Sequence, residues 1–124
     1  MGEPDERPPV WVGHVAMGTD RLAESYEFMQ RLGLRALEQG DEVGILELRG
    51  GTHLVLLPSE GPQSGPAPFD LMVEDVDATH ARLSESGLSP SEIARGDFHD
   101  SFTVRDPSGL DVTVNSSHVS DLPV

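Results

Sequence analysis

The second half of this 124-residue chain repeats the first half at a nearly constant spacing. Residues 17–20 match residues 71–74, and Leu32-Gly33-Leu34 matches Ser86-Gly87-Leu88, in both cases 54 positions later. Towards the C-terminus the spacing widens only where short loops are expected. A unit of about 50 residues cannot bury its own apolar face, so we expect two copies to pack together. The groove between the two copies is then the natural place for a ligand.

Hydrophobic periodicity and turn residues predict the same order in both copies, strand, helix and three strands, which is an α+β fold of two βαβββ modules. In the first copy we expect a helix from Thr19 or Asp20 to Gly33 and strands at 10–17, 34–38, 43–48 and 52–57. In the second copy we expect a helix from Asp75 or Asp77 to Gly87 and strands at 69–73, near 93–94, at 101–105 and at 110–115.

These elements divide the chain into one domain with two short ends. We expect a flexible segment at 1–9 and a single domain at 10–124, made of module one (10–58), a linker (59–67), module two (68–116) and a tail (117–124). The linker SEGPQSGPA is rich in Pro, Gly and Ser, as is typical of a connection between modules.

Composition excludes several classes of function. The chain has no cysteine and no lysine, so thiolate catalysis, Schiff-base chemistry and a P-loop lysine are excluded. Twenty-two acidic residues against eight arginines give a net charge of −14, which repels nucleic acid and either attracts a cationic ligand or only keeps the chain soluble. No apolar run is long enough to span a membrane. The first residues lack the pattern of a secretion signal, so we expect a cytoplasmic protein.

Three segments together resemble the vicinal oxygen chelate superfamily, which includes glyoxalase I, extradiol dioxygenases and bleomycin-resistance proteins. They are WVGHVAMGTDRLAESYEFMQRLGL, FDLMVEDVDATHARLSESGL and SFTVRDPSGLDVTV, and the resemblance covers roughly residues 10–116. It implies modules placed edge to edge, a curled mixed sheet around a cleft with the helices on the outer face, and a homodimer whose subunits close the cleft together. The same scaffold carries enzymes and simple binders, so it does not fix the function.

In the enzymes of this superfamily a divalent metal is held by the first and last strands of each module. The resemblance places those positions at His14 and Val55 in module one, and at Pro68 (or Phe69) and Thr113 in module two. Only His14 is a usual ligand, whereas metal catalysis needs about three protein ligands and an open position. We therefore expect neither a metal nor another cofactor.

Strand alternation nominates the residues that line the cleft. His14 is expected to face it as a ligand contact or a general base, while Val15 and Met17 face the helix. The full set of candidates is His14, Glu47, His53, Val55, His99, Ser101, Thr103, Asp111, Thr113 and Asn115. A polar row of this kind also fits the wet face of any open antiparallel sheet. Trp11 and Phe98 either stack on a planar ligand or pack in the core.

Two functions of different class follow. The first is a metal-free small-molecule binding protein of the bleomycin-resistance type, whose ligand is a cationic or aromatic antibiotic. The alternative is a metal-dependent lyase, isomerase or dioxygenase with a rearranged ligand set drawn from His14, Glu47, His53 and His99. A metal-free acid–base enzyme built on His14 and Glu47 is a third hypothesis, so catalysis stays open. His80 is expected on the surface, and His118 either folds back over the cleft or is solvated.

Overall fold

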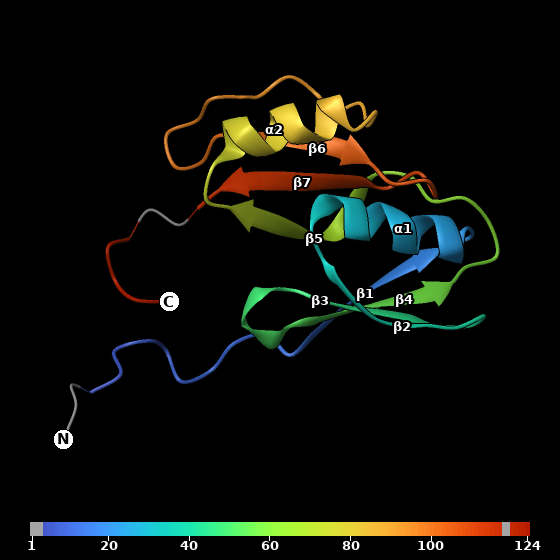
Figure 1. Ribbon diagram of the computed structural model, residues 1–124, viewed down its shortest axis with the longest axis horizontal. Coiled ribbons are helices and arrows are strands. Elements are labelled where there is room, and N and C mark those ends of the chain that lie inside the picture. Colours follow the sequence, from blue (N-terminus) through green and yellow to red (C-terminus); the bar gives the residue numbers. More distant parts are fainter. Residues whose placement is uncertain (1–3, 118–119) are drawn as a thin grey trace.

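The computed structural model describes residues 4–117 and 120–124, so His118 lies outside the described part of the chain. The first module contains β1 (His14–Thr19), α1 (Leu22–Leu32), β2 (Arg35–Gln39), β3 (Gly44–Glu47), a short 3-10 turn η1 (Arg49–Gly51) and β4 (His53–Pro58). The second contains β5 (Pro66–Val73), α2 (Val76–Glu85), β6 (Ser101–Arg105) and β7 (Asp111–Ser116) (Figure 1). The predicted α+β fold is confirmed. Neither described helix has the length and apolar character of a membrane span.

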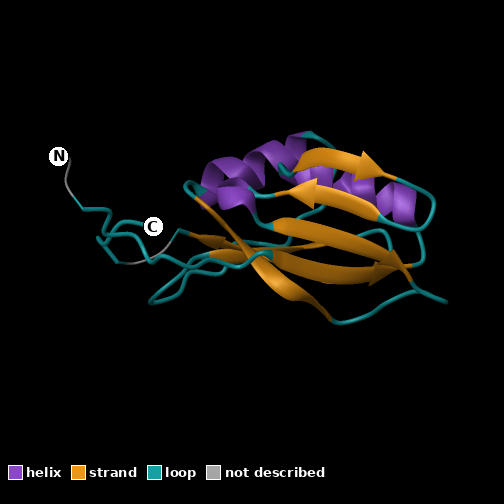
Figure 2. Cartoon of the chain, turned by 90° about the horizontal axis from the view of Figure 1, so that it is seen from below, coloured by secondary structure: helices purple, strands orange, loops and turns teal. Residues whose placement is uncertain are grey.

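The strands form two separate mixed sheets. The first has the order β1-β4-β3-β2 and the second the order β5-β7-β6. In both modules the first strand pairs in parallel with the last, and the remaining pairs are antiparallel. The sheets meet where β1 contacts β5, and the helices gather on one side of the strands (Figure 2). This arrangement leaves one broad face of the strands away from the helices.

The core lies between the helices and the inner faces of both sheets. Alternate strand residues point into it, and those that are fully or almost fully buried include Met17, Leu46, Leu54, Leu56, Phe102, Val104, Val112 and Val114. Helix α1 adds Tyr26, Phe28 and Met29 from one stripe, as an amphipathic helix does. The alternation sends the intervening strand residues to the opposite, open face.

Both helices end close to the predicted positions, but α1 begins later than expected. Arg21 precedes its first turn without a side-chain cap, and the predicted cap Thr19 instead accepts a hydrogen bond from the Arg21 amide at 3.0 Å. Gly33 ends the helix with φ = 126°, a conformation that suits glycine. Asp75 caps α2 by accepting from the Ala78 amide at 2.9 Å.

The second module lacks one expected strand. The segment predicted near 93–94 forms only an isolated bridge between Ala94 and Ser101. Its neighbour Arg95 binds the carboxylates of Asp77 and Asp100 through its side chain. The loop also contains Pro90, which has no amide proton to donate to a ladder. The second sheet therefore has three strands where four were predicted.

Two element boundaries also differ from the prediction. The first strand was expected from residue 10, but β1 starts only at His14. The linker was expected to extend to residue 67, but β5 starts at Pro66. The register of β5 against β7 shifts between Pro66 and Asp70, because the two prolines of this stretch cannot donate ladder hydrogen bonds.

A buried polar cluster joins the two modules. The Ser25 hydroxyl of α1 donates to the Asp106 carboxylate at 2.7 Å, and Thr19 lies 2.7 Å from the same hydroxyl. The Ser108 amide donates to the other carboxylate oxygen at 2.8 Å. All four residues are buried, and Asp106 is only 2% exposed. The turn before β7 is thereby fixed to the first helix.

The helices bind each other's C-terminal ends through arginines. Arg82 of α2 donates to the carbonyls of Arg31 and Leu32 at 2.8 and 3.0 Å. In return, Arg31 of α1 donates to the Ser86 carbonyl at the end of α2. A guanidinium at a helix C-terminus satisfies otherwise unpaired carbonyls and complements the helix dipole.

Candidate functional site

A row of four polar side chains crosses the open face of the first sheet, one from each strand. We call His14, His53, Glu47 and Arg35 the polar row. In the strand register His14 pairs with His53, His53 with Glu47, and Glu47 with Arg35. Directly paired residues on one face of a sheet have side chains within contact distance. The fold thus brings four residues that are distant in sequence into one continuous line.

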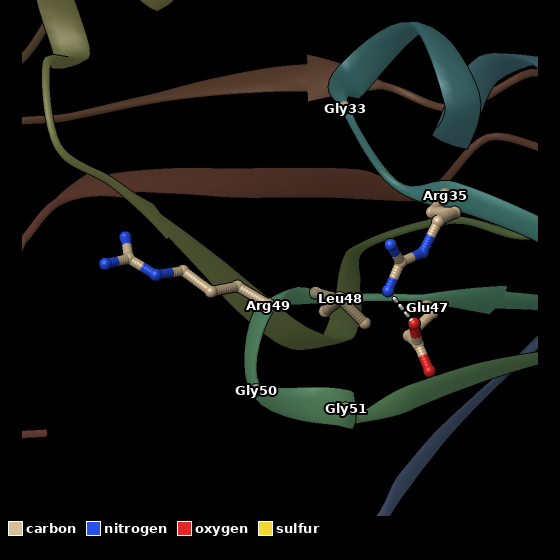
Figure 3. A pocket seen from close by; sticks show the side chains of 7 residues that line it. All are labelled: Gly33, Arg35, Glu47, Leu48, Arg49, Gly50 and Gly51. Atoms are coloured by element: carbon tan, nitrogen blue, oxygen red, sulfur yellow. Dashed lines mark hydrogen bonds and ion pairs between the residues drawn. The ribbon is translucent and has the colours of Figure 1, made fainter.

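Contacts within the polar row link all four side chains. The two histidine rings meet edge to face, with centroids 5.4 Å apart and planes at 75°. The Nε2 atom of His53 lies 3.1 Å from the Oε2 atom of Glu47. The other carboxylate oxygen of Glu47 accepts from the Arg35 guanidinium (Figure 3). These two hydrogen bonds, first that of Arg35 and then that of His53, hold the pKa of Glu47 below its usual value.

An apolar strip lies beside the polar row on the same open face. We call Ala16, Val55 and Ile45 the apolar row, because Ala16 pairs with Val55 and Val55 with Ile45 one pleat along the strands. Val55 and Ile45 are half-buried and Ala16 is exposed. A flat molecule lying on this face would therefore meet apolar atoms next to hydrogen-bonding groups.

A shallow hollow of about 430 Å³ lies at the Arg35 end of the polar row. It is lined by Gly33, Arg35, Glu47, Leu48, Arg49, Gly50 and Gly51. Figure 3 shows the Arg49 side chain extending away from the Arg35–Glu47 pair, and its guanidinium binds Glu74 of the second module at 2.9 Å. The hollow thus opens beside a carboxylate that is already paired.

The second sheet presents hydroxyls and paired charges on its alternate residues. Asp111 binds Arg105 at 3.0 Å, and the Asn115 side chain donates to Asp70 at 3.0 Å. Thr113 of β7 pairs with Thr103 of β6, and both are half-buried. The candidates Ser101, Thr103, Asp111, Thr113 and Asn115 thus lie on two neighbouring strands, separate from the polar row of the first sheet.

The residues predicted to line the cleft lie on both sheets. His14, Glu47, His53 and Val55 share the open face of the first sheet, where Arg35 joins them although the sequence did not nominate it. His99 lies in the loop before β6, and its Nδ1 atom is 3.0 Å from the Ser116 carbonyl. Trp11 and Phe98 are both exposed, at 70% and 75%, and neither packs in the core.

The metal positions implied by the superfamily do not fit a metal here. Of the four, Val55 and Pro68 have side chains with no donor atom, and Thr113 carries only a neutral hydroxyl. Elsewhere in residues 4–117 and 120–124, no three His, Asp or Glu side chains are grouped so that they could hold an ion. In the polar row the Glu47 carboxylate is already bound by Arg35 and His53.

The sequence matches the family model described as the Glyoxalase/Bleomycin resistance protein/Dioxygenase superfamily over residues 11–114. The chain belongs to this superfamily. No curated protein sequence matches it.

Solved structures of this superfamily fold share the architecture. A lactoylglutathione lyase from Agrobacterium tumefaciens has a TM-score of 0.73 at 19% identity, over 90% of this chain and 96% of the other. TnmS3, an antibiotic binding protein from Streptomyces sp. CB03234, has a TM-score of 0.71 at 22% identity, over 86% and 95%. The oxidase ChaP-H2 has a TM-score of 0.69 at 23% identity, over 89% and 95%. Such similarity establishes the fold and leaves the specific function open.

Proposed function

We propose that this chain is a metal-free small-molecule binding protein of its superfamily, whose ligand lies on the open face of the first sheet. The observation that carries the proposal is the pairing of the polar row with the apolar row. Ligand sites combine apolar surface with a few placed polar groups in the same way. The structural similarity to TnmS3, an antibiotic binding protein, supports the proposal.

The charges at this face favour a planar aromatic ligand over a cationic one. The Glu47 carboxylate already accepts hydrogen bonds from Arg35 and His53, so a cation would have to displace a partner. The net charge of −14 belongs to the whole surface and not to this row. Of the two ligand classes suggested by the sequence, the aromatic one therefore has the better support.

A second subunit is expected to cover the open face. The face exposes apolar groups, and more lie on the segment that enters β1, where Val10, Trp11 and Val12 are 78%, 70% and 58% exposed. Exposed apolar patches of this kind mark interaction surfaces. We propose a homodimer in which the ligand is enclosed between subunits.

Thermal-shift and calorimetric titrations with planar aromatic antibiotics and basic glycopeptide antibiotics test the proposed function. We expect at least one planar compound to raise the Tm and the basic compounds to leave it unchanged. Ala16→Lys places a charged chain in the apolar row and should abolish the shift. Ala81→Lys is the same change at an exposed position of α2, and this variant should keep the ligand-induced rise in Tm. If no member of the panel stabilises the protein, the proposal is wrong.

The alternative is the metal-dependent lyase, isomerase or dioxygenase. His14 contacts His53 and His53 contacts Glu47, but these three side chains would have to regroup to hold an ion together. Elemental analysis of protein purified without a metal-affinity tag separates the two proposals. We expect no stoichiometric metal. Near-stoichiometric zinc, iron, nickel or manganese would favour the enzyme instead.

A further inference from the structure

Glu47 controls which nitrogen of His53 carries the proton. Its carboxylate has the pKa lowered by Arg35 and His53, so it is ionised at neutral pH and can only accept hydrogen bonds. The His53 Nε2 atom, 3.1 Å from Oε2, must therefore donate. A neutral imidazole has a single N–H group, so the proton on Nε2 leaves Nδ1 as an acceptor.

The Nδ1 atom of His53 is open to a ligand. It has no hydrogen-bond partner among residues 4–117 and 120–124. In that part of the chain every fully buried side-chain nitrogen or oxygen has a partner, so an atom without one is not fully buried. The atom must therefore reach solvent, in agreement with a side chain that is 33% exposed. It is an acceptor whose direction is fixed by the Glu47 contact at the other end of the ring.

The surroundings of this acceptor select the shape of the ligand. The His14 ring stands 5.4 Å away, centroid to centroid, and offers an aromatic contact on one side. Val55, two residues along the same strand, is the middle of the apolar row, with Ala16 and Ile45 as its cross-strand neighbours. A flat ring can lie over the apolar row while a substituent reaches His53.

We infer that His53 anchors the ligand, with Nδ1 accepting a hydrogen bond from the hydroxyl of a planar phenol or enol while Glu47 and Arg35 fix the ring. This inference rests on the proposed function and specifies the chemistry of its ligand. Glu47 and Arg35 act as positioning residues, since Glu47 contacts His53 and Arg35 holds Glu47. An ether or any group without a donor hydrogen leaves the acceptor unsatisfied and binds less tightly.

The tautomer can be measured without a ligand. Long-range proton–nitrogen NMR spectra of ¹⁵N-histidine-labelled protein at pH 8 distinguish the two neutral forms, and the His53 signals are those missing from the His53→Asn variant. We expect wild-type His53 in the form protonated at Nε2, and a mixture of both forms in Glu47→Ala. His53 protonated at Nδ1 in the wild-type protein would overturn the inference.

A matched pair of ligands tests the anchor itself. Calorimetry with 1-naphthol and 1-methoxynaphthalene compares two planar probes that differ in the donor hydrogen. We expect the wild-type protein to bind 1-naphthol at least tenfold more tightly than 1-methoxynaphthalene. His53→Ala should bind the two probes equally, and His53→Asn, which keeps an acceptor near the Nδ1 position, should retain part of the preference.

His80→Ala is the control for loss of a histidine, because His80 lies on α2 away from the polar row and its Nε2 atom is 2.8 Å from the Ser91 carbonyl. It should keep the full preference, and circular dichroism checks that every variant is folded. Equal binding of both probes by the wild-type protein, or a preference that survives in His53→Ala, would overturn the inference while leaving the proposed function intact. Binding of neither probe would reject the phenol class, and the antibiotic panel would then decide the proposed function separately.

Discussion

Glu47 is held from two sides, by the Arg35 guanidinium and by the His53 ring. Both contacts stabilise its charged form, so the folded chain binds the carboxyl proton less tightly than the unfolded chain does. The contacts therefore stabilise the fold above the usual pKa of 4.5 and stop doing so as the pH falls through the lowered value. The polar row is thus coupled to the stability of the sheet that carries it.

Glu47→Gln should lower the Tm at pH 7, because the neutral amide loses the charged contact with Arg35. The difference from the wild-type protein should shrink as the pH falls from 4.5 through the lowered pKa of Glu47, where the carboxyl of the folded wild-type protein takes up its proton. Thermal unfolding followed by circular dichroism between pH 7 and pH 3 measures both curves.

Glu38→Gln, on exposed strand β2, is the matched control and should follow the wild-type curve. A Glu47→Gln deficit that stays constant down to pH 3 would contradict the assignment to the charged contact.

The tight turn before β7 determines how the linker between modules is placed. Gly109 has φ = 111°, a left-handed conformation, and the Gln63 amide donates to the neighbouring Ser108 carbonyl at 2.7 Å. A methyl group added to Gly109 would collide with the Gln63 carbonyl oxygen of the linker. This position therefore needs glycine both for its backbone angle and for the close approach of another segment.

Gly109→Ala should destabilise the protein by at least about 2 kcal/mol, since backbone strain and the collision act together. Gly61→Ala, in the same linker but with nothing within 4 Å of the added carbon, should change the free energy of unfolding little. Urea denaturation measures both. Equal, small effects of the two changes would mean that the linker is not fixed against the turn.

Alternation along single strands could be predicted from the sequence, and pairing between strands only partly. His14, His53 and Glu47 were nominated as cleft residues from their own strands, although the apolar neighbours of Glu47 occupy both faces of its strand. Arg35 was not nominated, since its contact with Glu47 depends on the antiparallel register of β2, which shifts between Ala36 and Glu38. The turn signal at Gly40-Asp41, which joins β2 to β3, fixes the start of that register, but the shift further along the strands is not visible in the sequence.

The missing strand of the second module shows that the internal repeat does not predict every element of secondary structure. Its copy in module one forms β2. In residues 88–100 Arg95 instead binds Asp100 and Asp77 of α2, and the segment forms a single bridge. Ion pairs and a proline replaced ladder hydrogen bonds there, and periodicity does not report such local competition. The ends of both helices, the Asp75 cap of α2 and the turn between β6 and β7 carried strong signals and were predicted closely, whereas the start of α1 was not.

At the scale of the whole molecule, the proposed dimer should be visible in solution. Light scattering after size exclusion should give twice the chain mass, and the Tm should rise with protein concentration, because association stabilises the folded state. Trp11→Ser removes a side chain that is 70% exposed and should shift the equilibrium towards the monomer. Leu122→Ser, also exposed at 71%, is the control. A monomer mass at every concentration would contradict the proposal.

Because Arg31 and Arg82 each bind the C-terminal end of the other helix, the two modules depend on each other if the chain is split. Each helix relies on a guanidinium from the other half to satisfy its last carbonyls, and Ser25 relies on Asp106. A polypeptide cut inside the linker would leave two pieces with bare helix ends and half a core each. We expect neither fragment to fold well by itself and the two to reassemble when mixed. The linker is therefore a suitable place to split the chain for a reporter of protein association.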